Sequence, residues 1–175
     1  MATIQMQVRP EDLKQVQQGK ERIPDPGIMV IFGASGDLTK RKLLPALFHL
    51  RQNNLLPEKF AIVGVARRPL GDEFAQDMRE GIIEFGGVDQ GDAKLDGFVK
   101  SISYYALNFD DPQDYAGLKS ELERIATEKN IGPDRLFYLA TAPEFFAGIV
   151  ENLVGGLGDA INFEIDVLLL HEGEE

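Results

Sequence analysis

The sequence predicts an α/β fold, a doubly wound parallel sheet with helices on both of its faces. Two observations carry this prediction. Short runs that are apolar at nearly every position recur along the chain, which is typical of strands buried on both faces of a parallel sheet. Between them lie longer stretches whose apolar residues recur at helical spacing. Strands that alternate with helices in this order form a parallel sheet covered on both sides.

The predicted strands are bounded by glycine, proline or polar residues. They lie at 28–32, 60–66, 102–107 and 135–140. Ligands of such sheets bind beyond the carboxyl ends of the strands, so the site is expected there. The residues to search around are Gly33, Arg67, Asn108 and Thr141.

The predicted helices follow the strands one by one. They lie at about 43–50, 72–85, 112–130 and 145–153. Pro45 falls inside the first helical pattern and lacks a backbone N–H, which predicts a kink or an irregular first turn. Gly86 and Gly87 end the second helix, and a Gly/Asp-rich loop is expected to follow them.

The chain divides into three predicted parts. Residues 1–26 are polar and read as a flexible N-terminal arm. Residues 27–158 form the predicted α/β domain, and 159–175 form an atypical tail. Alternation of apolar and polar residues over 161–166 indicates a possible extra strand in this tail. His171 stands near glutamates at its end, but the spacing matches no ligand motif and predicts no metal site.

Composition excludes several classes of partner. The net charge is −11 and the pI is about 4.7, which disfavours binding to nucleic acid or to an anionic membrane. There are no cysteines, and therefore no disulfide framework and no thiol nucleophile. No apolar run reaches the ~18 residues of a membrane span, and no signal peptide is visible at the N-terminus. We expect a cytoplasmic protein.

A glycine-rich turn after the first strand predicts a phosphate site. Gly33 and Gly36 lie three residues apart before a helical pattern, and Thr39 stands where dinucleotide-binding sequences usually carry a third glycine. Unpaired N–H groups and the helix dipole favour an anion at such a turn. Arg67 and Arg68 end the second strand, where NAD-binding sequences carry a carboxylate. A guanidinium suits a 2′-phosphate, which favours NADP over NAD.

Three blocks of the sequence resemble the N-terminal, NADP-binding domain of glucose-6-phosphate dehydrogenase, a Rossmann-like domain. They are VIFGASGDLTKRKLLPAL at 30–47, IVGVAR at 62–67 and LFYLATAP at 136–143. The blocks follow the family's order and spacing, and the resemblance covers about residues 28–158. It implies oxidation of D-glucose 6-phosphate to 6-phosphoglucono-lactone, a step of the pentose phosphate pathway and glucose metabolism, with NADP as cofactor.

The resemblance also implies a set of cofactor-binding residues. The glycine turn is expected to wrap the pyrophosphate, Arg67 to hold the 2′-phosphate, and Pro143 to lie beside the nicotinamide. Phe146 lies on the following helix, where the family also contacts cofactor. No catalytic or metal-binding residue is assigned. The expected cofactor contacts are Gly33, Ala34, Ser35, Gly36, Asp37, Leu38, Thr39, Lys40, Arg67, Pro143 and Phe146.

The chain also departs from the family pattern. The family's Glu-Lys-Pro-Phe-Gly block is missing after Leu153, as is the C-terminal domain with its catalytic histidine and dimer-forming sheet. Neither His49 nor His171 lies in a matching context. We therefore expect a truncated or frameshifted chain that is inactive alone and that self-associates or pairs with a full-length subunit.

Two other functions stay open on the sequence. The chain could be a non-catalytic NADP-binding module or subunit. It could also be another NADP-dependent oxidoreductase of the same fold, of the sugar-epimerase type. Enzymes of that type usually keep a third glycine in the turn, where this chain has Thr39. They also carry a Tyr-x-x-x-Lys pair, and Tyr115 with Lys119 is the one pair at that spacing in this sequence.

Overall fold

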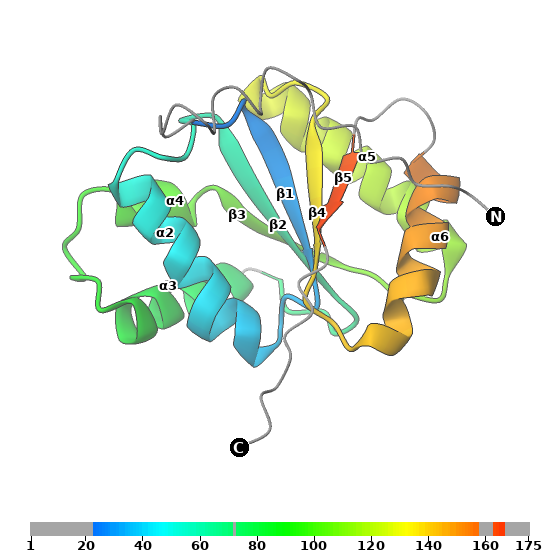
Figure 1. The fold of residues 1–175 in the computed structure, drawn as a ribbon, viewed down its shortest axis with the longest axis horizontal. Coiled ribbons are helices and arrows are strands. Elements are labelled where there is room, and N and C mark those ends of the chain that lie inside the picture. Colours follow the sequence, from blue (N-terminus) through cyan, green and yellow to red (C-terminus); the bar gives the residue numbers. More distant parts are fainter. Residues whose placement is uncertain (1–22, 72, 158–162, 167–175) are drawn as a thin grey trace, which may run out of the picture.

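A computed structural model describes residues 23–71, 73–157 and 163–166 of the chain. Its centre is a parallel sheet with the strand order β3-β2-β1-β4-β5 (Figure 1). The strands are β1 (Gly27–Phe32), β2 (Phe60–Ala66), β3 (Ile102–Ala106), β4 (Arg135–Leu139) and β5 (Phe163–Asp166). The chain first builds outward from β1 to β3, and then returns to add β4 on the other side of β1. This reversal creates a switch point at the carboxyl ends of β1 and β4.

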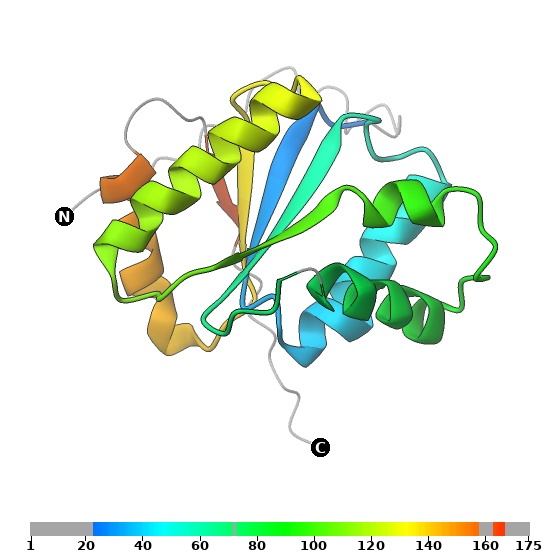
Figure 2. The same cartoon turned by 180° about the vertical axis from the view of Figure 1, so that it is seen from behind.

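Helices cover both faces of the sheet. They are α2 (Leu44–Gln52), α3 (Glu73–Gly86), α4 (Leu95–Val99), α5 (Pro112–Lys129) and α6 (Phe146–Leu157). Figures 1 and 2 show α2, α3 and α4 on one face, with α5 and α6 on the other. The predicted doubly wound α/β class is confirmed.

The burial of β1 on both faces explains why its sequence is a continuous run of apolar residues. Ile28, Val30 and Phe32 are buried in the cluster that includes α5 and α6. Met29 and Ile31 point the other way, into the cluster that includes α2, α3 and α4. Because side chains alternate between the two faces and both faces are covered, every position of β1 from Ile28 onward must be apolar.

The irregular start of the first helix is confirmed and has a defined form. Residues Thr39–Leu43 make a π-helical turn, in which the amide of Leu44 donates to the carbonyl oxygen of Thr39, before α2 continues regularly. Pro45 follows at once. Its ring cannot donate a hydrogen bond and crowds the preceding turn of a regular α-helix, and a wider turn relieves that crowding.

A short helix, α4, lies within the stretch predicted as a loop. Gly97 stands inside it, and only five residues are helical, so the local pattern gave no helix signal. The burial of Leu95 and Phe98 against α2 and α3 holds this segment in place. Tertiary packing therefore decides the conformation here.

The strand β5 lies within the stretch 161–166, whose alternation indicates a possible extra strand. It pairs in parallel with β4, with Arg135 opposite Phe163. The predicted N-terminal arm lies almost wholly outside the described residues, as do 158–162 and 167–175 with His171.

Candidate functional site

The turn after β1 requires glycine at its first position. Gly33 has φ of +82°, in the left-handed region that other residues rarely adopt. A Cβ there would lie 2.5 Å from the carbonyl oxygen of Ala140 and 2.9 Å from Cγ2 of Thr141. The turn is therefore pressed against the carboxyl end of β4, at the switch point of the sheet.

Backbone hydrogen bonds fix the turn to β2 and leave the amide of Ser35 without a partner among the described residues. The amides of Gly33 and Ala34 both donate to the carbonyl oxygen of Val65, at 2.8 and 3.2 Å. The amide of Gly36 donates to Gly33 at 3.0 Å. Ser35 is exposed, and its amide has no hydrogen-bond partner among the described residues. This amide is positioned to donate to a ligand at the head of the helix.

Three charged side chains after the turn are paired within the chain. Asp37 pairs with Arg41 at 3.2 Å. Lys40 reaches Asp77 on α3 at 2.6 Å, and this hydrogen bond raises the pKa of Lys40. The Lys40–Asp77 pair spans two elements, so it could not be read from local sequence. Lys40 would therefore have to leave Asp77 to contact a phosphate, whereas the exposed Ser35 needs no such rearrangement.

Two of the expected cofactor contacts in this segment are buried. Thr39 is fully buried, and its Oγ1 has no hydrogen-bond partner in the described part of the chain. Ala34 is also fully buried, whereas Leu38 is half-buried. The side chains of Thr39 and Ala34 are thus covered by other parts of the protein.

Arg67 stands at the carboxyl end of β2 and is exposed. Its Cζ lies 5.2 Å from the ring centroid of Phe145 and 5.8 Å from that of Phe109. No hydrogen bond or ion pair joins its guanidinium to another residue in the described ranges. The guanidinium is thus held by aromatic faces, with its N–H groups available.

The loop after β4 places the last two predicted residues. Pro143 is exposed and begins a 3₁₀ turn, Pro143–Phe145. Phe146 begins α6, is half-buried and packs against the core on the α5 and α6 side. Phe145 and Phe109, the rings beneath Arg67, were missed. Phe145 and Phe146 are adjacent in a helical pattern, which predicts that both belong to the core. Only the fold shows that the ring of Phe145 lies near Arg67.

The opposite edge of the sheet has a basic cavity of about 270 Å³. It is lined by Arg51, Glu58, Lys59, Phe60, Gly97, Lys100, Ser101 and Lys129. Several of its cations follow or end a helix: Arg51 is in the last turn of α2, Lys100 caps α4 and Lys129 ends α5. Cations at helix C-termini offset the dipole and the unpaired carbonyls, which accounts for them without a ligand.

His49 lies away from the glycine turn and is hydrogen-bonded within the protein. His49 lies in the last turn of α2, with its ring nitrogens 2.9 Å from Oε1 of Gln52 and 3.1 Å from the carbonyl oxygen of Gly86. It is therefore far along the helix from the glycine turn.

Within the described ranges, no group of three or more acidic, histidine or cysteine side chains could hold a metal ion. None of the helices described there is long and apolar enough to cross a bilayer.

Comparison with known proteins identifies the domain. Residues 30–162 match the family model described as "Glucose-6-phosphate dehydrogenase, NAD binding domain". Glucose-6-phosphate 1-dehydrogenase of Chlamydia pneumoniae is 42% identical over 129 residues, which are 73% of this chain and 25% of that protein. The enzyme of Leuconostoc mesenteroides is 41% identical over 127 residues, 72% of this chain and 26% of that protein.

Solved structures agree with these sequence matches. The chain superimposes on a glucose-6-phosphate dehydrogenase in complex with its substrate glucose 6-phosphate, with a TM-score of 0.72 and 35% identity. That match covers 82% of this chain and 30% of the other. The Mycobacterium avium enzyme gives a TM-score of 0.65 at 29% identity, over 81% of this chain and 29% of the other.

The chain spans about a quarter of the length of the curated relatives that it matches. The part that it matches is the domain for a nicotinamide dinucleotide. These relatives are named as dehydrogenases, which are oxidoreductases. The chain therefore belongs to the glucose-6-phosphate dehydrogenase family, and residues 30–162 correspond to its NAD binding domain.

Proposed function

We infer that this chain binds NADP, in preference to NAD, along the carboxyl edge of its sheet. In the whole enzyme this domain would serve the oxidation of D-glucose 6-phosphate to 6-phosphoglucono-lactone. The observation that carries the cofactor preference is Arg67: an exposed guanidinium at the end of β2 whose donors are unused within the described residues. A carboxylate in its place would repel a 2′-phosphate.

The residues present fit a dinucleotide. Gly33 brings the turn so close to β4 that any larger side chain would clash, and the exposed amide of Ser35 can donate to a pyrophosphate oxygen. The carbonyl oxygen of Val65 ties the glycine turn to the end of β2, which carries Arg67 two residues later. One short stretch of the sheet edge thus combines a pyrophosphate site and a 2′-phosphate site.

The described residues hold and orient the cofactor. Bound NADP supplies a hydride acceptor at its nicotinamide ring. Pro143, exposed at the start of the loop after β4, is proposed to flank this ring, and Phe146 to line the same side. His49 is at the far end of α2 and takes no part. Among the described residues none is assigned as the base for the sugar hydroxyl, so turnover by this chain alone is not expected.

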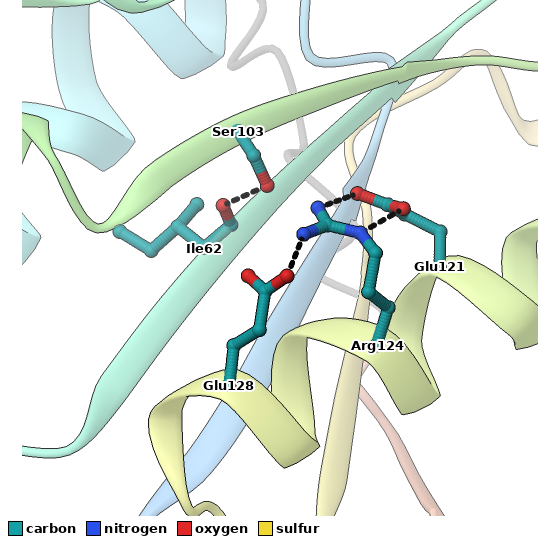
Figure 3. Close-up of polar contacts among 5 residues, drawn as sticks. All are labelled: Ile62, Ser103, Glu121, Arg124 and Glu128. Atoms are coloured by element: carbon teal, nitrogen blue, oxygen red, sulfur yellow. Dashed lines mark hydrogen bonds and ion pairs between the residues drawn. The ribbon is translucent and has the colours of Figure 1, made fainter.

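The test is to measure Kd for NADP and for NAD on the purified chain and on Arg67→Gln. Removal of charge-assisted hydrogen bonds to a phosphate should raise the Kd for NADP about ten- to a hundredfold and leave that for NAD nearly unchanged. Arg124→Gln is the matched control. It also removes an exposed arginine, but from the outer face of α5, where Arg124 already pairs with Glu121 and Glu128 (Figure 3).

Two results would contradict the proposal. If Arg67→Gln keeps the preference of the unmodified chain, Arg67 does not read the 2′-phosphate. If the unmodified chain binds NAD as tightly as NADP, the domain is a general dinucleotide site and the preference for NADP is wrong. A non-catalytic NADP-binding subunit, the second candidate, predicts the same binding and differs in showing no glucose 6-phosphate turnover in any assembly.

A further inference from the structure

We propose that Phe145, standing on Phe109, is a positioning residue that holds the Arg67 guanidinium where the 2′-phosphate of NADP binds. The inference rests on the proposed function and adds two side chains from separate loops to that site. Arg67 follows β2, Phe109 follows β3, and Phe145 follows β4. The distances of 5.2 and 5.8 Å from Cζ of Arg67 to the two ring centroids are within the range of cation–π attraction.

An aromatic contact orders a guanidinium without using its hydrogen-bond donors. The ring attracts the face of the guanidinium, whereas the N–H groups point outward in its plane. Arg124 shows the opposite case: its N–H groups donate to Glu121 and Glu128 at 2.5 to 2.8 Å, so they are occupied (Figure 3). Arg67 is therefore both restrained and able to bind an anion with two parallel hydrogen bonds.

Phe109 is a buried ring against which Phe145 and Arg67 pack. Phe109 is 4% exposed, and its ring centroid lies 5.8 Å from that of Phe32 at the end of β1. Its carbonyl oxygen accepts hydrogen bonds from the Tyr115 hydroxyl and from Nδ2 of Asn152, both at 3.0 Å. Burial raises the pKa of Tyr115 to about 12, so its hydroxyl remains a donor at neutral pH.

Phe145 contacts both the buried ring of Phe109 and the guanidinium of Arg67. Its ring packs edge-on against Phe109, with centroids 5.7 Å apart. Phe145 is half-buried, whereas Phe109 belongs to the core, so a substitution at Phe145 removes the ring closer to Arg67 and leaves the core filled. Phe145 is thus the position at which the inference can be tested.

The chain also offers a matched pair for comparison. Arg41 lies 4.9 Å over the ring of Phe85, which is 39% exposed near the end of α3. Arg41 also pairs with Asp37, so its donors are partly used. Phe85 is not among the expected cofactor contacts, so Phe85→Leu removes a comparable cation–π contact without altering the surroundings of Arg67.

The experiment measures Kd for NADP and NAD on Phe145→Leu, Phe145→Tyr and Phe85→Leu, with thermal unfolding as a check on folding. We expect Phe145→Leu to weaken NADP binding about two- to fivefold with little change for NAD, since one ring contact is lost. Phe145→Tyr keeps the aromatic face and should retain the affinity. Phe85→Leu should leave both constants unchanged.

A double variant decides whether Phe145 acts through Arg67. In the Arg67→Gln background, Phe145→Leu should have no further effect on the NADP to NAD ratio. An equal effect in both backgrounds, or an equal loss for NADP and NAD, would overturn the inference. If Arg67→Gln lowers the ratio and Phe145→Leu does not, only this inference fails. If Arg67→Gln leaves the ratio unchanged, the proposed function of Arg67 fails as well.

A measurement on the unmodified chain covers the case in which Phe145→Leu does not fold. An N–H group held against a ring has its proton resonance shifted by the ring current. The Nε–H signal of Arg67 should therefore be displaced from that of its exposed neighbour Arg68. Coincident signals would overturn the inference.

Discussion

The two edges of the sheet use arginine in opposite ways. At the amino edge, Arg51 donates to the carbonyl oxygens of Pro57 and Glu58, and Arg135 donates to those of Gly132 and Asp134. These guanidiniums therefore use their donors on backbone carbonyl groups of the protein itself. At the carboxyl edge, the guanidinium of Arg67 rests on aromatic rings and donates to no other described residue.

The difference follows from the direction of the helices. Each helix that follows a parallel strand begins near the carboxyl edge and ends near the amino edge, so unpaired N–H groups gather at one edge and unpaired carbonyls at the other. Asp111, the N-cap of α5, illustrates the carboxyl edge by accepting from the amide of Gln113. Arg51 and Arg135 thus find carbonyl partners within the chain, whereas the donors of Arg67 stay available for an anion.

The largest expected effect is at the glycine turn. Gly33→Ala places a Cβ 2.5 Å from the carbonyl oxygen of Ala140 and forces a left-handed conformation on alanine. Strain and overpacking together should lower the free energy of unfolding by about 3 kcal/mol and abolish NADP binding. Chemical denaturation and a binding titration test both parts.

Gly148→Ala is the control for that substitution. Gly148 lies in α6, and an added Cβ would meet nothing within 4 Å. Alanine at this position should leave stability unchanged or raise it by about 0.5–1 kcal/mol. Equal losses for the two variants would show that the turn has no special need for glycine.

A smaller effect is expected at the amino edge. Arg51→Gln removes hydrogen bonds to two backbone carbonyls and a cation from the end of α2. The free energy of unfolding should fall by about 1–2 kcal/mol, while the Kd for NADP stays within error of the unmodified chain. Arg67→Gln should show the reverse, a large change in Kd with little change in stability. A loss of NADP binding in Arg51→Gln would break the distinction between the edges.

The smallest effect is expected beneath the glycine turn. Thr39→Val replaces a buried hydroxyl, which lacks a partner among the described residues, by a methyl group of similar size. Stability should rise by up to about 1 kcal/mol, because the hydroxyl is no longer desolvated without compensation. A loss of stability in thermal unfolding would indicate that Oγ1 has a partner, and a loss of NADP affinity alone would indicate that the partner is the cofactor.

Sequence predicted the parts of the fold that depend on local pattern. The strands of the sheet were visible because Val30 and its neighbours are apolar on both faces, and the start of α5 was visible from Asp111 and Pro112. The α4 helix was not visible, because five residues around Gly97 give too little periodic signal and rely on packing.

The site was predictable in its backbone and less so in its side chains. The glycine turn and Arg67 carry signals in their own residue types. The pairing of Lys40 with Asp77 and the rings of Phe109 and Phe145 beneath Arg67 depend on contacts between distant segments. No local pattern encodes such contacts, since each residue alone is ordinary at its position.

The most direct test of the difference between the edges is a map of amide chemical shifts during titration of the chain with NADP and, separately, with NAD. The account predicts shifts at Ser35 and Gly36 with both, and at Arg67 to a much greater extent with NADP. It predicts none at Lys59 or Lys100, which line the basic cavity of the amino edge. Shifts centred on Lys59 and Lys100, with Ser35 and Arg67 unmoved, would contradict it.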